Sequence, residues 1–367
     1  MSQVRVLHVI ARMNIGGTAT YISNLIENLE GIGATNLLAM GTVPKGEAED
    51  GVVENLPVVR VPGLTRKLGL VRDFRAWLHL QRVIRDFKPD IIHSHTFKAG
   101  LLVRLSKSTA KKVHSFHGHH LYDPEFGRFE RAVLNFVERK LAKRTDAIIT
   151  IGNRVRDELL GVGIGVKNQY LPIPPGIEDP LSYRVRDVRT ELDIDKDAFV
   201  VMWLGRFTRV KRPDIVKSLA RELPEMTFVM AGGGELLRET KQDAPNNLKI
   251  VGYRDKYEMW EIADVGLCTS DSEGMPLSLI EAQMSSVPVV STNVGSVAEI
   301  VIDKVTGRLA NDLRELAEAL NWVQHEMASS SSMSDSARDN ALLKFSASSM
   351  AEKHMEIYLN LLGKVRS

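Results

Sequence analysis

The chain has 367 residues, of which 44% are hydrophobic and 26% charged. This length is too great for one common domain and sufficient for two, and the composition is typical of a soluble globular protein. Cys268 is the only cysteine, which excludes an intrachain disulfide and fits a reducing, cytoplasmic compartment. No apolar run is long enough for a transmembrane helix, and the first apolar segment, Val4–Ile10, is too short for a signal peptide.

The charge is unevenly distributed along the chain. The formal net charge is +2 overall, but residues 1–178 carry 25 Lys and Arg against 17 Asp and Glu. A basic first half is suited to an anionic partner, such as the inner face of a membrane or a charged acceptor. Scattered charges that only solvate the surface are the alternative. No nucleic-acid partner is expected.

Short apolar runs alternate with longer amphipathic segments in the first half of the chain, which favours a parallel sheet covered by helices on both faces. Gly16 and Gly17 follow the first strand and precede a helix, so they would aim helix N–H groups at an anion; an ordinary tight turn is the alternative. The predicted strands are Val4–Ile10, Asn36–Met40, Val58–Val61, Asp90–His93, Lys112–Phe116 and Ala147–Ile151, and the predicted helices are Ala19–Leu29, Arg72–Phe87, Phe126–Thr145 and Asn153–Leu160.

The predicted helix Phe126–Thr145 carries both apolar and basic side chains. We expect the apolar stripe of Phe129, Val133, Leu134, Phe136 and Leu141 to face the core and the basic residues to face outward, because such an apolar stripe is normal for a surface helix. The alternative is a helix that rests on a membrane.

Tyr170–Ile177 contains three prolines and a glycine, which do not fit a helix or a central strand. We interpret it as a hinge that ends a first domain of residues 1–178. A second domain would span 179–346, and a C-terminal helix in 347–367 would pack back on the first domain. A serine run at Ser329–Ser332 is expected to be a surface loop.

The second half repeats the alternation of strands and helices, so two Rossmann-like domains are expected, with ligands bound at the carboxyl ends of their strands. The predicted strands are Phe199–Leu204, Thr227–Ala231, Leu248–Val251, Val265–Cys268 and Val287–Thr292, with Val305–Leu309 as a short strand or turn; the predicted helices are Leu181–Leu192, Asp214–Arg221, Lys256–Ile262, Leu277–Met284 and Leu313–Met327.

The stretch Thr269–Glu281 joins the strand Val265–Cys268 to the helix Leu277–Met284. Gly274 is expected to allow a sharp turn, and Pro276 suits a helix start. The free N–H groups of Leu277 and Ser278 would form a phosphate site at the positive end of the helix dipole. Glu273 and Glu281 flank this site and would accept hydrogen bonds from hydroxyls. An ordinary helix start with a solvated Glu281 is the alternative.

Several motifs occur together in one order, namely Gly16-Gly17, Gly205-Arg-Phe with Lys211, Gly252-Tyr-Arg254, and Glu273-Gly-Met-Pro-Leu-Ser-Leu-Ile-Glu281. With this set the chain resembles the retaining glycosyltransferases of family 4 over essentially its full length. The resemblance is strongest over Val200–Leu309. It implies the GT-B fold, an α/β architecture of two facing Rossmann-like domains with the active site in the cleft between them. The first domain would serve the acceptor and the second the nucleotide-sugar donor.

The resemblance also implies roles for particular residues. The catalytic group would comprise His117, beside the donor sugar, and Glu273. Contacts to the donor diphosphate are implied for Gly16, Gly17, Arg206, Lys211, Leu277 and Ser278; contacts to the base and ribose for Gly205, Tyr253, Arg254 and Glu281; and contacts to the donor sugar for Glu273, Gly274 and Met275.

The implied activity is transfer of a sugar, with retention, from a nucleotide-diphospho-sugar to a glycan or lipid-linked acceptor in polysaccharide, lipopolysaccharide or glycolipid synthesis. Two fixed cations would stabilise the leaving diphosphate, so no metal and no cofactor are expected. No residue suits a nucleophile, and front-face attack is the mechanism that the resemblance implies. The alternatives are a non-catalytic nucleotide-sugar or glycan binding module and a GT-B sugar epimerase.

Two groups of residues imitate metal sites. Asp193 and Asp195 match the Asp-x-Asp pattern, but they lie in a polar turn before a strand. Histidines are frequent in the first half but lack a thiol or arranged carboxylates, so they are not expected to bind zinc; they are His93, His95, His114, His117, His119 and His120.

Overall fold

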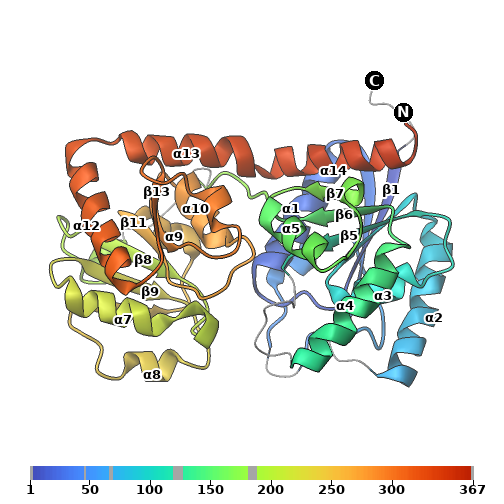
Figure 1. Ribbon diagram of the computed structural model, residues 1–367, viewed down its shortest axis with the longest axis horizontal. Helices are drawn as coiled ribbons and strands as arrows, with labels where there is room; N and C mark the ends of the chain where they lie inside the picture. Colours follow the sequence, from blue (N-terminus) through green and yellow to red (C-terminus); the bar gives the residue numbers. More distant parts are fainter. Residues whose placement is uncertain (1–2, 45–46, 66–68, 119–126, 181–187, 365–367) are drawn as a thin grey trace. The chain divides into compact units, whose positions relative to one another are not determined.

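The computed structural model describes residues 3–44, 47–65, 69–118, 127–180 and 188–364. It divides into two units (Figure 1). Unit 1 comprises Met1–Ile177 together with Ala347–Ser367, and unit 2 comprises Glu178–Ser346. The first crossing between units lies one residue from the boundary predicted at 178, and the chain returns to unit 1 at the start of the predicted C-terminal segment.

Unit 1 is built on a seven-stranded sheet with the order β3-β2-β1-β4-β5-β6-β7, in which all neighbours are parallel. Several strands, β4 among them, are buried along their whole length, because helices cover both faces of the sheet. The strands are β1 (Val4–Ile10), β2 (Ala34–Met40), β3 (Val58–Arg60), β4 (Ile91–His95), β5 (Lys111–Phe116), β6 (Ala147–Thr150) and β7 (Tyr170–Pro172).

The last strand lies inside the segment that we interpreted as a hinge. Tyr170–Pro172 pairs with β6 at the edge of the sheet. Proline has no amide hydrogen for a ladder and is tolerated at a sheet edge. The hinge prediction is therefore wrong for these three residues.

The helices of unit 1 form a layer on each face of the sheet. On one face, α1 packs against α14, which buries Met350, Met355 and Tyr358 in the same core as α1. On the other face, α2 and α3 contribute to a second core. The helices are α1 (Gly17–Gly31), α2 (Leu70–Phe87), α3 (Phe97–Arg104), α4 (Arg128–Ala142), α5 (Asn153–Gly161) and α14 (Ala347–Leu361), with 3-10 turns at Gly51–Asn55 and Lys167–Gln169.

Unit 2 repeats this design with a parallel six-stranded sheet of order β10-β9-β8-β11-β12-β13. The strands are β8 (Val200–Leu204), β9 (Thr227–Ala231), β10 (Leu248–Gly252), β11 (Val265–Cys268), β12 (Val289–Thr292) and β13 (Gly307–Ala310), and the helices are α6 (Val188–Glu191), α7 (Pro213–Glu222), α8 (Leu237–Lys241), α9 (Lys256–Glu261), α10 (Leu277–Met284), α11 (Val297–Ile300), α12 (Leu313–Ser329) and α13 (Ser332–Phe345), with a 3-10 turn at Arg209–Lys211.

Two helical segments of unit 2 differ in how far the sequence predicted them. Residues 181–187 of the predicted helix Leu181–Leu192 lie outside the described residues. The helix α13 was not predicted from the sequence. It begins at Ser332 and α12 ends at Ser329, so the loop predicted at Ser329–Ser332 is confined to Ser330 and Ser331. The buried side chains of α13, Met333, Ala337, Ala341 and Phe345, recur every four residues, and this helical spacing was the available signal.

Both sheets reverse their strand order at one place. The chain order runs outward in one direction from β1 and in the other from β4 in unit 1, and the same reversal separates β8 from β11 in unit 2. In open parallel sheets, ligands bind beyond the carboxyl ends of the strands at such a switch point. The loops after these strands are therefore where each unit is expected to bind its ligand.

Apolar side chains of α2 and α4 are exposed. In α2 the buried residues are Ala76, Leu80 and Ile84, whereas Phe74 points to solvent. In α4 the prediction that the apolar stripe faces the core holds for Leu141, which is buried, and is wrong for Phe129, Val133 and Phe136, which are exposed. Among the described residues, no helix has the length and apolarity that crossing a membrane requires.

Candidate functional site

Three strand-end loops of unit 2 are joined by backbone hydrogen bonds. The amide of Gly205 donates to Ala231 O, that of Phe207 to Gly233 O, and that of Gly232 to Gly252 O, at 2.7–3.1 Å. A Cβ on Gly232 would lie only 2.0 Å from Gly205 O, so the close approach requires glycine. The loops after β8, β9 and β10 thus form one rigid backbone surface.

The loop after β11 is fixed to the loop after β8. The indole of Trp203 donates to Thr269 Oγ1 at 3.2 Å, and the hydroxyl of Thr269 is 2.9 Å from Lys211 O. The amide of Asp271 donates to Val210 O at 2.9 Å. These bonds place the motif Thr269–Glu281 beside the segment that carries Arg206 and Lys211.

The turn of the motif depends on a glycine from a different loop. Gly274 is not among the glycines with positive φ, but Gly295 has a φ of +54°. A Cβ on Gly295 would lie 1.8 Å from Glu273 O, and the amide of Ser296 donates to Gly274 O at 2.8 Å. The backbone of Gly295 therefore supports the turn that we attributed to Gly274 alone.

Each glutamate of the motif is held by a lysine. Glu273 forms an ion pair with Lys211 and accepts a hydrogen bond from Ser270 Oγ at 2.5 Å. Glu281 is buried and lies 2.6 Å from Lys256 Nζ. Burial alone would lower the pKa of Lys256, but its attraction and hydrogen bond to Glu281 outweigh burial and raise it. The alternative of a solvated Glu281 is therefore wrong.

The helix that follows begins where the sequence predicts. α10 starts at Leu277 with Pro276 at its N-cap, and Pro276 provides no side-chain hydrogen bond to the first turn. The first N–H groups of a helix have no intrahelical acceptor. The amides of Leu277 and Ser278 are thus available to an anion, while Met275 beside them is buried.

The remaining predicted donor residues lie on the same loops. Arg206 is exposed directly after Gly205. Tyr253 is 76% exposed, and its ring packs against Gly233, where a Cβ would lie 2.5 Å from a ring carbon. Arg254 lies 2.6 Å from Glu191 in an exposed ion pair. Unit 2 therefore brings cations, helix N–H groups, two carboxylates and an aromatic ring to one edge of its sheet.

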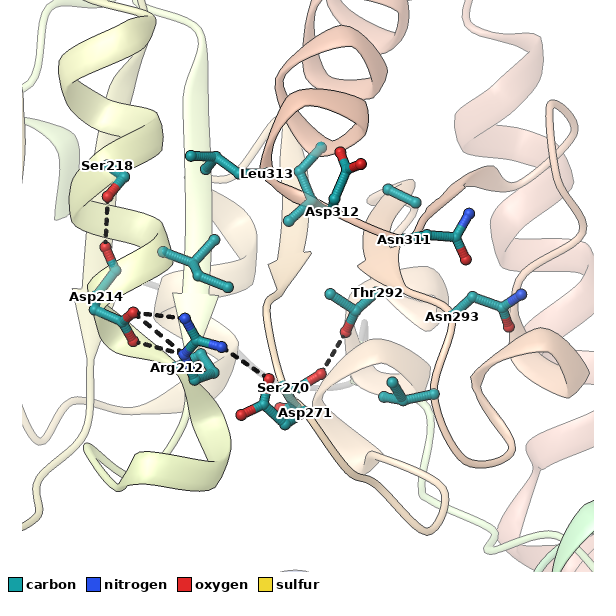
Figure 2. Close-up of a pocket in the computed structure, with 14 residues that line it drawn as sticks. Arg212, Asp214, Ser218, Ser270, Asp271, Thr292, Asn293, Asn311, Asp312 and Leu313 are labelled. Carbon is teal, nitrogen blue, oxygen red and sulfur yellow. Dashed lines mark hydrogen bonds and ion pairs between the residues drawn. The ribbon is translucent and has the colours of Figure 1, made fainter.

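A cavity of about 440 Å³ is lined in part by residues that follow β8, β11 and β12 (Figure 2). Its wall includes Asp271 and Asn293, but none of the predicted site residues. Arg212 points toward it and is already paired with Asp214 at 2.8 Å and with Asp271 at 3.0 Å. Because its cation is neutralised, we do not place the diphosphate in this cavity.

In unit 1 the predicted glycines lie at the start of α1. Gly16 is the N-cap residue, with a φ of +149° that favours glycine. A Cβ there would have no atom within 4 Å, so the conformation and not crowding requires glycine. Gly16 and Gly17 are both exposed, and a ligand has room to approach their backbone.

His117 belongs to a buried cluster of imidazoles and tyrosines in unit 1. Its Nε2 lies 3.0 Å from His95 Nδ1, and the ring of Tyr21 is edge-on to it at 4.5 Å. His354 on α14 contacts Tyr21, with 3.0 Å between Nε2 and the hydroxyl. His8 on β1 lies 3.3 Å from His95. Neither His8 nor His354 was predicted from the sequence. His354 lies in a stripe of buried residues with Met350, Ala351 and Tyr358, and this helical spacing was the available signal.

Of the other predicted histidines, His93 on β4 also belongs to this cluster, with 4.2 Å between its ring centroid and that of His95, whereas His114 does not. His114 points to the opposite face of β5, where its Nδ1 lies 2.9 Å from Ser94 Oγ, since successive residues of a strand alternate between faces. His119 and His120 lie outside the described residues. Asp193 and Asp195 lie in an exposed turn, as the sequence predicts.

The chain has two parallel sheets, and each reverses its strand order at one switch point. The polar side chains described above lie at the ends of these strands. Together these features define the GT-B class of glycosyltransferase folds. A family model described as glycosyl transferases group 1 matches residues 185–340, and one described as a glycosyl transferase 4-like domain matches residues 16–176. The chain belongs to the GT-B glycosyltransferases of family 4, and it is an enzyme of this class.

Relatives and solved structures agree with this assignment. A UDP-Gal:alpha-D-GlcNAc-diphosphoundecaprenol alpha-1,3-galactosyltransferase of Escherichia coli is 25% identical, over 86% of this chain and 87% of its own. The O-antigen biosynthesis glycosyltransferase WbnH of Escherichia coli is 24% identical, over 80% and 82%. The structure of sucrose-phosphate synthase of Thermosynechococcus elongatus has a TM-score of 0.83 and 19% sequence identity to this chain. The structure of HepE of Anabaena in complex with UDP and glucose has a TM-score of 0.82 and 18% identity. Each match covers 98% of this chain and 100% of the other chain.

We predict that Gly295→Ala destabilises unit 2 more than Gly252→Ala does. Both glycines have positive φ, but a Cβ on Gly252 meets nothing within 4 Å. The backbone strain common to both variants costs about 1–2 kcal/mol. The overlap with Glu273 adds about 1–3 kcal/mol for Gly295→Ala. Urea unfolding of the two variants measures the difference, and equal losses would contradict the support of the turn by Gly295.

We predict that the protein loses stability as the pH falls below about 6.5, the ordinary pKa of histidine. Burial lowers the pKa of His8 and His117 to about 3 and that of His354 to about 4. The unfolded state therefore binds protons between these values that the folded state does not, so stability rises with pH across this window. Each such histidine contributes about 1.4 kcal/mol per pH unit.

Urea unfolding at several pH values between these limits measures the slope. The variant His8→Gln should have a smaller slope, by about one histidine's share. A free energy of unfolding that does not change across the window would contradict the prediction. The carboxylates with lowered pKa, Glu49, Asp157 and Asp214, add to the slope only below about pH 5, so the share of the histidines is measured above this pH.

Proposed function

We propose that the chain is a metal-independent, retaining glycosyltransferase that moves a sugar from a nucleotide-diphospho-sugar to a glycan or lipid-linked acceptor in cell-surface polysaccharide, lipopolysaccharide or glycolipid synthesis. The observation that carries the proposal is the ion pair between Lys211 and Glu273 at the start of α10. It places a cation for a phosphate directly beside a carboxylate for a sugar hydroxyl.

The donor would be bound by the strand-end loops of unit 2. Arg206, Lys211 and the amides of Leu277 and Ser278 supply positive charge and donors for the diphosphate. Glu281 would accept hydrogen bonds from the ribose hydroxyls. A diphosphate that approaches Lys211 would share this cation with Glu273, which leaves the carboxylate freer to accept from the transferred sugar.

The base and sugar would use neighbouring groups. The exposed ring of Tyr253 and the side chain of Arg254 would border the base. Gly274 and Met275 would line the sugar beside Glu273. In unit 1, the open backbone at Gly16 and Gly17 would approach phosphate oxygens, and His117 would contact a sugar hydroxyl.

The transfer would proceed by front-face attack. The bond between the anomeric carbon and the phosphate oxygen breaks, and a bond from the same carbon to the acceptor oxygen forms on the same face. The acceptor proton passes to the leaving phosphate oxygen. The fixed cations stabilise the charge that develops on the diphosphate, which supports a mechanism without metal. Glu273 is engaged by Lys211 and Ser270, which favours a role as hydrogen-bond acceptor over one as nucleophile.

The names of relatives suggest the donor and the acceptor. The Escherichia coli galactosyltransferase is named for a UDP-sugar donor and a diphosphoundecaprenol-linked acceptor, and the HepE structures contain UDP or UDP-glucose. We therefore propose UDP as the nucleotide, a lipid-linked glycan as the acceptor, and the cytoplasmic face of the membrane as the place of action.

Two other functions are the alternatives. A non-catalytic nucleotide-sugar or glycan binding module would bind the donor without turnover, and a GT-B epimerase would change the sugar without an acceptor. Transfer of label from the donor to a defined acceptor, with multiple turnovers, excludes both.

We predict that UDP raises the melting temperature of the protein in the presence of EDTA. At a concentration of about 100 times its Kd, a ligand that binds only the folded state adds about 2.7 kcal/mol of stability. Lys211→Ala and Glu281→Gln should lose most of this gain, because each removes a donor contact. Thermal unfolding with UDP, GDP and ADP measures the effect.

The matched control is Lys217→Ala. Lys217 is a lysine of α7 in the same unit that donates to Gln242 O, and its variant should respond to UDP like the wild type. Stabilisation that requires added metal, or that persists in Lys211→Ala, would contradict the donor site.

A peripheral contact with an anionic membrane is the second part of the proposal. The exposed side chains of α4 form an apolar stripe of Phe129, Val133 and Phe136, with 81% of Phe129 exposed. Lys140 lies over the ring of Phe136 at 5.4 Å. The opposite face of α4 is tied to unit 1, because buried Glu138 pairs with buried Arg104 at 2.7 Å.

The first turns of α2 carry a second exposed group of apolar and basic side chains. Leu70 is 94% exposed, and Val71 and Phe74 are also exposed, beside the exposed cations Arg72 and Arg75. Both α2 and α4 begin at the lower end of unit 1 in the view of Figure 1. Apolar side chains interleaved with cations are typical of helices that lie in a membrane interface.

We predict that the protein binds vesicles that contain anionic phospholipid and that the double variant Phe129→Ser/Phe136→Ser loses this binding. Removal of two inserted aromatic rings lowers the apolar area that the membrane buries. Vesicle flotation measures the bound fraction. The control Leu343→Ser changes an exposed leucine of α13 in unit 2 and should bind like the wild type. Equal binding by the double variant would contradict the membrane surface.

A further inference from the structure

A line of four polar side chains crosses the sheet of unit 1. Asn36 lies on β2, His8 on β1, His95 on β4 and His117 directly after β5, and these strands are successive neighbours. Asn36 Oδ1 is 3.3 Å from His8 Nε2, His8 Nδ1 is 3.3 Å from His95 Nε2, and His95 Nδ1 is 3.0 Å from His117 Nε2. We call these four residues the histidine relay.

A backbone carbonyl fixes the inner end of the histidine relay. Asn36 Nδ2 donates to Ile26 O at 3.3 Å. A carbonyl oxygen only accepts, so the amide nitrogen must face Ile26 and the amide oxygen must face His8. The amide oxygen also only accepts, and His8 must therefore carry its proton on Nε2.

The same reasoning passes along the relay from one ring to the next. A neutral imidazole has one N–H and one lone pair. With its proton on Nε2, His8 accepts at Nδ1 from His95 Nε2–H. His95 in turn accepts at Nδ1 from His117 Nε2–H. The lone pair of His117 is then left on Nδ1.

The surroundings keep the rings neutral. Burial lowers the pKa of His8 and His117 to about 3 and lowers that of His95 well below its usual value. The other titratable groups that face the relay are uncharged as well, because burial lowers the pKa of His93 and His354 and raises that of Tyr21 and Tyr358. Because every ring is neutral, each ring nitrogen is either a hydrogen-bond donor or an acceptor. The direction of the hydrogen bonds along the relay is therefore defined.

The outer end of the relay is open. His8 and His95 are fully buried, whereas His117 is partly exposed. Among the residues that the structure describes, none forms a hydrogen bond with Nδ1 of His117. The relay therefore connects a buried anchor to one accessible lone pair.

We propose that the histidine relay holds His117 in the tautomer with its proton on Nε2, so that Nδ1 is a fixed hydrogen-bond acceptor for a sugar hydroxyl, and that Asn36, His8 and His95 are positioning residues. A lone pair attracts a hydroxyl and repels a phosphate oxygen, so His117 selects the sugar and not the diphosphate. That the hydroxyl belongs to a sugar rests on the proposed function. The direction of the hydrogen bonds in the relay does not.

A metal site is the competing interpretation of the same rings. His8, His93 and His95 place one ring nitrogen each within 4.8 Å of the others. However, His93 bonds to Tyr358 and Ser115 at 2.7 Å each, and the relay uses both nitrogens of His8 and His95. A metal ion would have to displace these hydrogen bonds, so the relay accounts better for the geometry.

The test is the tautomer of His117, read from the imidazole ¹⁵N spectrum of the full chain labelled at histidine. The His117→Gln variant assigns the resonances by their loss. We expect the ligand-free wild type to have Nε2 protonated and Nδ1 unprotonated at neutral pH. A proton on Nδ1 of wild-type His117 would overturn the proposal without any variant.

Two matched variants test the anchor. Asn36→Leu removes the acceptor of the relay, and the second tautomer of His117 should become populated. Tyr358→Phe removes the partner of His93 but leaves the relay intact, so it should keep the wild-type tautomer. Equal tautomer populations of His117 in Asn36→Leu and the wild type would overturn the role of the anchor.

Ligands separate this proposal from the proposed function. UDP-galactose and UDP-glucose should shift the Nδ1 resonance of His117, and UDP alone should not. Turnover in Asn36→Leu should fall about tenfold, the rate equivalent of one hydrogen bond, with unchanged thermal stabilisation by UDP. If UDP stabilises the protein but neither UDP-sugar shifts Nδ1, the hydroxyl contact is overturned while the donor site stands. If UDP does not stabilise the protein, the proposed function fails, and the tautomer still decides the relay.

Discussion

The carboxyl edge of a parallel sheet is the constraint on which both units depend. All strands of such a sheet end at the same edge, so their loops crowd together, and their backbone polar groups need partners. In unit 2 the loops satisfy one another, as between Gly232 and Gly252 and between Phe207 and Gly233. Gly232 and Gly295 allow these contacts, since any Cβ there would overlap a backbone oxygen. The result is a rigid rim from which side chains project in fixed directions.

The charges at this rim are arranged in pairs. Glu273 with Lys211 and Glu281 with Lys256 form two ion pairs, the first in the turn before α10 and the second one turn into this helix. A buried carboxylate without a partner is costly, so the lysines compensate the glutamates and hold them in one orientation. The site is thus pre-organised, and little reorganisation is required when a charged ligand replaces one partner.

Unit 1 satisfies one cluster of buried polar groups without charge. The imidazoles and hydroxyls of this cluster, such as those of His95, His93 and Tyr358, satisfy one another as neutral donors and acceptors, whereas buried Lys98 after β4 pairs with Asp73. A neutral polar cluster suits hydroxyl-rich ligands, and an edge with paired charges suits an anionic one. The two sheets share a topology, but their strand ends differ in the ligand chemistry that they favour.

Much of the fold could be predicted from the sequence. The strand Val265–Cys268 and the helix Leu277–Met284 occur with the predicted bounds, because their signals are local: an apolar run, a turn and a helix start. The helix α13 had such a local signal in the spacing of its buried residues, but the outward orientation of Phe129 and Phe136 could not be read in this way. Which face of an amphipathic helix is covered depends on what packs against it, and for α4 the buried pair of Glu138 and Arg104 sets the orientation.

The sequence by itself determined the two-domain α/β class, the order of its elements and the set of polar residues that follow the strands, because these depend on periodicity and on residues close together in the chain. Only the tertiary structure decided which of those residues meet. Gly295 reaches the turn at Glu273 from another strand end, Lys256 holds Glu281 from α9, and His8 joins His95 and His117 across three neighbouring strands. Such contacts join residues far apart in the chain, and no local pattern specifies them.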